Sequence, residues 1–302
     1  GFQALLDNST GTVNTAMGRQ SLQNNTTASG NTAYGHNTLN TVTTNGCNTA
    51  VGGSALFNNT AANNTALGHS ALVANTTGDQ NVAVGVSALA CNTEGLENTA
   101  VGRFALCANA TGDNNTAVGK AALQKSTTDN NTAVGMETLA CTTSGFGTAV
   151  GYRAMKANTT SSGSTAMGYQ AMCANTTGSN NTAFGLEALK TNISGSGNTA
   201  VGRDALETNT ASDNTAVGYE ALKLNAGGSR NTAVGRNTLE ANTTGARNVA
   251  IGSSTMRVCT TANDSVAVGY QANRYNTSGS GNCSLGAYAL HGNTTGGDNV
   301  GI

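Results

Sequence analysis

Residues 98–119, NTAVGRFALCANATGDNNTAVG, contain one complete repeat of this sequence and the start of the next. The motif Asn-Thr-Ala-Val-Gly recurs along all 302 residues at intervals of 16 or 17, and its glycines include Gly18, Gly35, Gly52 and Gly68. Helical repeats need more than about 30 residues, because each must hold a pair of helices. A period of 16–17 residues suits one turn of a solenoid, so the sequence predicts an all-β, parallel β-solenoid (β-roll) with coils of that length.

The composition stays the same from one end of the chain to the other. Asn, Thr, Ala and Gly dominate throughout, and there is no proline, which would remove a ladder hydrogen bond from a strand. We therefore predict one continuous solenoid domain over residues 1–302. Solenoids normally carry polar caps, and none is evident at either end. We accordingly expect a segment of a longer chain, or coils that stack end to end.

The motif also predicts which side chains face the interior. We expect two short strands in each coil, and alternate residues of a strand point to opposite faces. The position of Met17 also holds Val51, Leu67 and Phe184, so we predict that this position and the preceding Thr position face inward. The Ala between them then faces outward, and its small size indicates either a closely approaching subunit or a crowded turn. This ladder contains Ala16, Ala33, Ala50 and Ala66.

Equal positions on stacked coils form ladders with rungs about 4.8 Å apart. The Asn that opens the motif is predicted to pass amide hydrogen bonds from coil to coil, and the Gly that closes it to take a positive φ at a corner. The Asn ladder contains Asn14, Asn31, Asn48, Asn64, Asn81 and Asn98. Asn-Thr-Thr-Gly segments form the other corner, where Asn75-Thr76-Thr77 is either a glycan acceptor or ordinary turn chemistry.

Charge and motif content argue against several function classes. The net charge of −1 argues against nucleic acid as a partner, because phosphate binding needs a basic surplus. No apolar run approaches the roughly 20 residues that cross a bilayer, so we expect no membrane insertion in this segment. The three histidines lack a recurring nucleophile and carboxylate, and the seven cysteines lack metal-ligand spacing. We therefore predict no enzyme, no cofactor and no metal site.

Three coils carry a family resemblance. Asn81-Val82-Ala83-Val84-Gly85, Asn248-Val249-Ala250-Ile251-Gly252 and Ser265-Val266-Ala267-Val268-Gly269 resemble the head repeat of trimeric autotransporter adhesins. Tyr219-Glu220-Ala221-Leu222, with the Asn-Thr-Thr-Gly segments, resembles repeats of phage-type tail fibres. The resemblance implies a left-handed β-roll, a homotrimer, and a place outside the cell, at a cell surface or on a virion. The period here is longer than is usual in adhesin heads, so the trimer geometry can differ.

Two functions fit these patterns. The first is a structural or adhesive fibre, either an adhesin head or a tail-fibre shaft. It would assemble with itself as a homotrimer or end-to-end filament and present a repetitive surface to a host glycan or protein. Its candidate contacts are the large side chains after the corner Gly, since aromatic and Arg residues are favoured at interfaces: Arg103, Phe104, Tyr152, Arg153, Tyr169, Tyr219 and Tyr270. The alternative is ice binding through Thr ladders, against which the inward facing predicted for Thr weighs.

Overall fold

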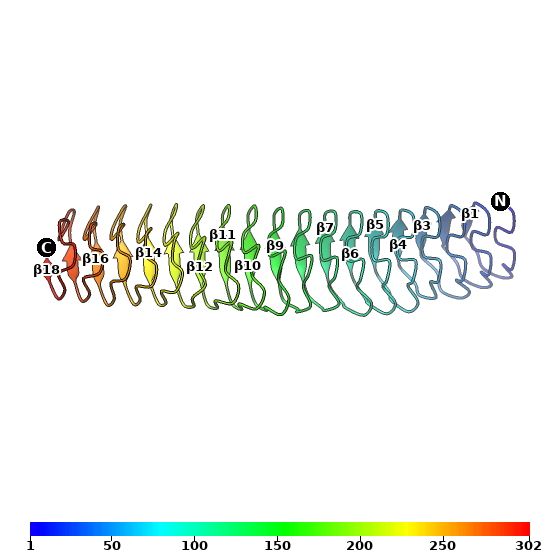
Figure 1. Cartoon of the computed structure of the whole chain (residues 1–302). Coiled ribbons are helices and arrows are strands. Elements are labelled where there is room, and N and C mark those ends of the chain that lie inside the picture. Colours follow the sequence, from blue (N-terminus) through cyan, green and yellow to red (C-terminus); the bar gives the residue numbers. More distant parts are fainter. The chain divides into compact units, whose positions relative to one another are not determined.

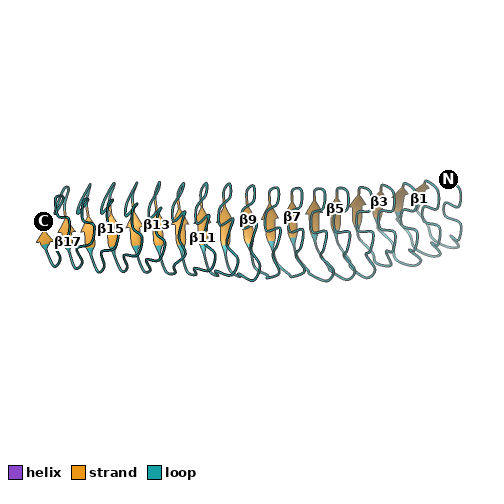
Figure 2. Cartoon of the chain, in the orientation of Figure 1, coloured by secondary structure: helices purple, strands orange, loops and turns teal.

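The computed structural model describes residues 1–302 and contains 18 short β-strands and no helix. Each coil contributes one strand, and turns make up the rest of it (Figures 1 and 2). Contacts divide the chain into two compact units, Gly1–Thr148 and Ala149–Ile302, here called the N-terminal unit and the C-terminal unit. The strand β9 (Thr148–Val150) lies at their boundary.

The bounds of the other strands repeat with the sequence period. The N-terminal unit contains β1 (Thr15–Met17), β2 (Thr32–Tyr34), β3 (Thr49–Val51), β4 (Thr65–Leu67), β5 (Val82–Val84), β6 (Thr99–Val101), β7 (Thr116–Val118) and β8 (Thr132–Val134). The C-terminal unit contains β10 (Thr165–Met167), β11 (Thr182–Phe184), β12 (Thr199–Val201), β13 (Thr215–Val217), β14 (Thr232–Val234), β15 (Val249–Ile251), β16 (Val266–Val268), β17 (Cys283–Leu285) and β18 (Val300–Gly301).

Within each unit, neighbouring strands pair in parallel and in register. Thr99 pairs with Thr116 and Ala100 with Ala117, so each position of the motif stacks on its own equivalent. The same register holds from β10 to β18 in the C-terminal unit, where Thr165 pairs with Thr182. The predicted all-β, parallel solenoid with coils of about 17 residues is confirmed.

The predicted facing of the strand is wrong. Ala100 and Ala117 are fully buried, whereas Val101 and Val118 are exposed. The same inversion applies to the ladder of Ala16, Ala33, Ala50 and Ala66, of which all but the half-buried Ala16 are buried. The interior is filled by the Ala-Leu pair, such as Ala105 and Leu106, and by buried Asn side chains. That narrow space accepts only a methyl group from the strand, so the larger Val and Met side chains point outward.

The Ala-Leu segment is not the second strand that the repeat length predicts. Phe104 and Leu106 both have positive φ, 60° and 48°, which non-glycine residues rarely adopt. Their amide groups still bond to neighbouring coils, because Phe104 N donates to Val86 O at 3.1 Å and Leu106 N to Ala122 O at 3.0 Å. The segment is therefore tied to the coils on both sides without forming a β-ladder.

The corner glycines carry the positive φ that the motif predicts. Gly102 has φ of 135°, and an added Cβ there would lie 2.6 Å from the backbone carbon of Gly119 on the next coil. No side chain fits at that distance, so the corner stacks backbone directly on backbone.

Candidate interaction surface

The outer faces of the strands form the most regular surface of each unit. We call the side chains at the first and third strand positions the Thr–Val face. Because pairing is in register, each position becomes a row with residues about 4.8 Å apart, and the two rows lie about 6.7 Å apart along the strand. The eight strands β1–β8 thus carry rows roughly 34 Å long in the N-terminal unit.

The third-position row is apolar and accessible. In the N-terminal unit its exposed members are 36–55% accessible. They are Met17, Tyr34, Leu67, Val101, Val118 and Val134. The C-terminal unit repeats the row with Met167, Phe184, Val217, Val234, Ile251 and Leu285. Single exposed apolar residues are ordinary, but large contiguous apolar patches are rare on monomeric proteins, so this row is the candidate contact surface.

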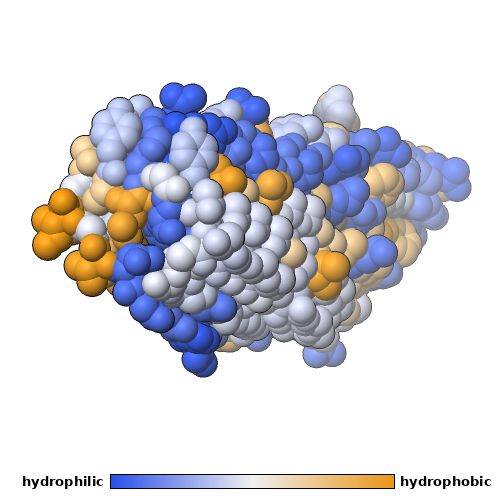
Figure 3. Space-filling view, turned by 60° about the vertical axis from the view of Figure 1, so that its left-hand side comes forward, coloured by the Kyte–Doolittle hydropathy of each residue, from blue (hydrophilic) through white to orange (hydrophobic).

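Hydropathy varies around the coil as well as along it. In Figure 3, where the C-terminal unit comes forward, a broad face of near-neutral residues is bordered by hydrophilic residues on one side and by scattered hydrophobic ones. The solenoid therefore presents chemically different faces to its surroundings, and an apolar partner meets only part of the surface.

Two Asn ladders hold the coils in register. In the ladder that opens the motif, Asn98 N donates to Asn81 Oδ1 at 3.0 Å, and Asn98 Nδ2 donates to Gly112 O at 2.8 Å. The Asn of the Asn-Thr-Thr-Gly corner forms a second ladder, in which Asn92 Nδ2 donates to Asn75 Oδ1 at 2.8 Å. The second ladder was missed from the sequence, although Asn recurs at this position in most coils, with Val42, Ser126, Thr142 and Cys259 as exceptions.

The second ladder favours one of the two interpretations of Asn75-Thr76-Thr77, the turn, over the glycan acceptor. Asn75 is fully buried, and its Nδ2 donates to Asn59 Oδ1 at 2.6 Å and to Gly78 O at 2.8 Å. A glycan attaches through this same nitrogen. Turn and ladder chemistry therefore accounts for Asn75 in the folded chain.

Five predicted contact residues fall into two separate groups. Arg103 and Phe104 lie in the N-terminal unit, where the guanidinium carbon is 4.6 Å from the ring centre. Tyr152, Arg153 and Tyr169 lie in the C-terminal unit. The rings of Tyr152 and Tyr169 stack with centres 5.3 Å apart, and the Arg153 guanidinium lies 4.9 Å from the Tyr152 ring. Arg103 and Tyr169 remain exposed, and the other three side chains are half-buried.

The other two predicted contacts lie on further coils of the C-terminal unit. Tyr219 sits between the guanidinium groups of Arg203 and Arg236, at 5.7 and 5.6 Å from its ring centre. Tyr270 makes an edge contact with Tyr288 at 5.4 Å. The seven residues thus form separate stacks with other coils between them in the sequence, and they do not converge on a single site.

A ladder of alternating charge was not anticipated. Directly after the Leu or Met of successive coils in the C-terminal unit, the charge alternates through Glu207, Lys223, Glu240 and Arg257. Lys223 Nζ lies 2.8 Å from Glu220 Oε1 and 3.8 Å from Glu207 Oε2. The hydrogen bond with Lys223 lowers the pKa of Glu220 and raises that of Lys223. Further along, Arg257 Nε lies 2.7 Å from Glu240 Oε2. These pairs neutralise the charges at this edge, so it presents little net charge to a partner.

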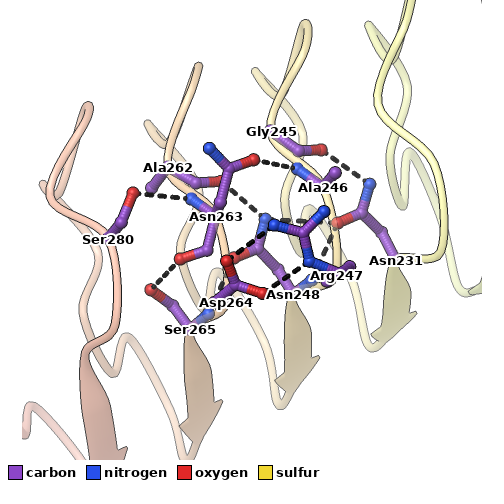
Figure 4. Close-up of polar contacts among 10 residues, drawn as sticks. All are labelled: Asn231, Gly245, Ala246, Arg247, Asn248, Ala262, Asn263, Asp264, Ser265 and Ser280. Atoms are coloured by element: carbon purple, nitrogen blue, oxygen red, sulfur yellow. Dashed lines mark hydrogen bonds and ion pairs between the residues drawn. The ribbon is translucent and has the colours of Figure 1, made fainter.

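The loop edge of the C-terminal unit is closed by side chains that bond from coil to coil (Figure 4). Ala246 N donates to Asn263 Oδ1 at 2.8 Å, and Asn263 N donates to Ser280 Oγ at 3.0 Å. Arg247 donates to both carboxylate oxygens of Asp264 at 2.6 and 2.7 Å, which lowers the pKa of Asp264. Backbone groups that a loop would leave to solvent are thereby partnered within the protein.

The remaining surface offers little enclosed space. An open notch of about 240 Å³ lies at the shortened corner of the 16-residue coil between Gly52 and Gly68, lined by Asn45, Thr60 and Asp79 among others. No group of three or more His, Cys, Asp or Glu side chains is placed to hold a metal ion. No helix in the chain has the length and apolar character needed to cross a membrane.

Comparison of the chain with protein-family models and with curated proteins found no match.

Proposed function

We propose that this chain is the rod-forming segment of an extracellular fibre, and that copies of it associate side by side as a homotrimer through the Thr–Val face. The observation that carries the proposal is the contiguous row of accessible apolar side chains at the third strand position. Burial of such side chains on association is favourable in proportion to the apolar area removed from water.

The outward position of the Val row determines how such a trimer would pack. The buried Ala ladder cannot contact another subunit, so the Val row takes the place near the threefold axis. Tyr34 and Phe184 interrupt the smaller Val side chains of that row. A packed interface accommodates such differences in size by interdigitation. The Tyr and Arg stacks after the corner glycines remain outside, where a host glycan or protein can reach them.

The solution mass tests this proposal directly. One chain is 30.0 kDa, so a trimer has a mass of 90 kDa, three times that value. The double substitution Val101→Lys and Val118→Lys places charges in the row and should reduce the particle to a single chain. Val86→Lys is the matched control, because Val86 is an accessible Val in the same unit but lies after the corner Gly, outside the row. A wild-type mass of 30.0 kDa would contradict the proposal.

Ice binding is the second candidate, and the position of the Thr row favours it. The outer face carries a row of partly exposed threonines in register, including Thr99, Thr116 and Thr132. The repeat pattern had predicted that these side chains point inward. A monomer that inhibits ice recrystallisation and loses this activity on Thr116→Lys would support it. The fibre ranks first because the large side chains of the neighbouring row prevent a uniformly flat surface.

A further inference from the structure

Cys91 and Cys107 lie on consecutive coils of the N-terminal unit, in the segments that follow Leu89 and Leu106. Cys91 N donates to Cys107 O at 3.0 Å, so the two residues are directly linked through the backbone. Leu89 N donates to Ala105 O at 3.0 Å, and Asn109 Nδ2 donates to Asn92 Oδ1 at 3.0 Å. The two coils are therefore fixed against each other on either side of the cysteines.

The two side chains therefore project from backbone segments that are hydrogen-bonded to each other. Cys91 is exposed and Cys107 is half-buried. Burial, followed by the neighbouring Cys91 thiol, raises the pKa of Cys107. Thiolate is the reactive form of cysteine, so the raised pKa lowers the reactivity of Cys107, and the exposed Cys91 is the side chain that an oxidant reaches first.

We propose that Cys91 and Cys107 form a disulfide bond that staples their two coils when the protein meets a low-molecular-weight disulfide as oxidant. Adjacent coils lie about 4.8 Å apart, and the two cysteines are offset by one residue along them. Disulfides span Cα separations of roughly 4.4–6.8 Å, which accommodates such an offset. The other cysteines are Cys47, Cys141, Cys173, Cys259 and Cys283, and none of them lies within one position of another cysteine on a consecutive coil. The pair is thus distinguished from the rest by position as well as by contact.

The reaction is two successive thiol–disulfide exchanges. The Cys91 thiolate attacks one sulfur of the oxidant, forms a mixed disulfide and releases the first small thiolate. The Cys107 thiolate then attacks Cys91 Sγ, forms the protein disulfide and releases the second small thiolate. The two cysteines lose two electrons and two protons, and the small disulfide gains both as two thiols.

The test is to incubate the full chain with oxidised glutathione, alkylate the remaining thiols under denaturing conditions and measure the intact mass. We expect the mass of a single chain, without a disulfide to another copy, in which two of the seven cysteines have not been alkylated. Cleavage after acidic residues at Glu94 and Glu97 separates the two cysteines, so the bridged peptides should stay joined until reduction. Cys91→Ser and Cys107→Ser should each abolish this product.

Cys47→Ser is the matched control, because it removes an exposed thiol elsewhere in the same unit and should leave the bridge intact. Circular dichroism of the serine variants shows whether each still folds. The proposal is overturned if all thiols remain alkylatable, if glutathione stays attached to Cys91 without closure, or if the joined peptides contain another cysteine pair.

Discussion

Asn75 donates a hydrogen bond from Nδ2 to Oδ1 of Asn59 on the preceding coil at 2.6 Å, and both side chains are fully buried. Asn75 Oδ1 in turn accepts from Asn92 Nδ2 on the next coil. The Asn75 amide therefore both donates and accepts within the same column. Its removal breaks the bonds to Asn59, Gly78 and Asn92, although Asn92 Nδ2 keeps its bond to Gly95 O at 3.0 Å.

We predict that Asn75→Ala lowers the free energy of unfolding by about 1–3 kcal/mol, because it removes three buried hydrogen bonds that each contribute roughly 0.5–1.5 kcal/mol. Urea unfolding of the full chain measures this change. Asn58→Ala is the control, because Asn58 is exposed and one residue from the ladder position Asn59. Equal midpoints for the two variants would show that the ladder adds no stability.

Because the corner glycines stack backbone on backbone, we predict that they do not tolerate a side chain. Gly102→Ala should destabilise the chain by about 1–3 kcal/mol, because alanine must adopt a strained φ. Its Cβ also meets the backbone of Gly119. Gly53→Ala is the control, since its Cβ would only touch the His69 ring at 3.4 Å. Thermal unfolding monitored by circular dichroism should separate the two, and a full-stability Gly102→Ala would contradict the backbone contact.

The inward position of Ala and the outward position of Thr and Val predict which strand positions tolerate a larger side chain. Ala117→Val introduces two methyl groups into a filled interior and should cost about 1–3 kcal/mol. Thr116→Val, on the outer face of the same strand, should change stability by no more than about 0.5 kcal/mol. Chemical unfolding midpoints provide the comparison. If Thr116→Val proved the more damaging of the two, the interior would lie on the other side.

The Arg247–Asp264 pair should show its effect in the pKa of Asp264 rather than in a large change of stability, because both side chains are exposed. The guanidinium holds the pKa of Asp264 below its ordinary value. The stability that the pair contributes is fully present above the ordinary Asp pKa and is lost as pH falls through the lowered one. NMR titration should find the Asp264 pKa higher in Arg247→Gln. An unchanged pKa would mean that the pair does not form in solution.

The period and the corner glycines made the solenoid predictable from the sequence. A 16–17-residue repeat with Gly at a fixed place leaves few architectures, and absence of proline agrees with strands. The facing was not predictable by the usual rule, because large apolar residues ordinarily point inward. Here Leu106 and the Asn side chains already fill the coil, so Val101 is left outside.

The Ala-Leu segment shows a second limit. Leu106 has positive φ, and no local sequence signal distinguishes such a leucine from one in an ordinary strand. The candidate contacts were predicted as a set from their shared position after the corner Gly. Their division into Tyr152–Tyr169 and other stacks depends on which side chains meet on adjacent coils, and that emerges only in three dimensions.

The in-register pairing of Thr99 with Thr116 has an evolutionary consequence. Removal of residues 103–119 deletes one whole repeat and joins Gly102 directly to Lys120. Each position of the remaining coils then stacks again on its equivalent. Whole coils can therefore be gained or lost by recombination between repeats without a new contact having to evolve. Length is the property that selection can adjust most freely, and the fold is suited to serve as a molecular ruler.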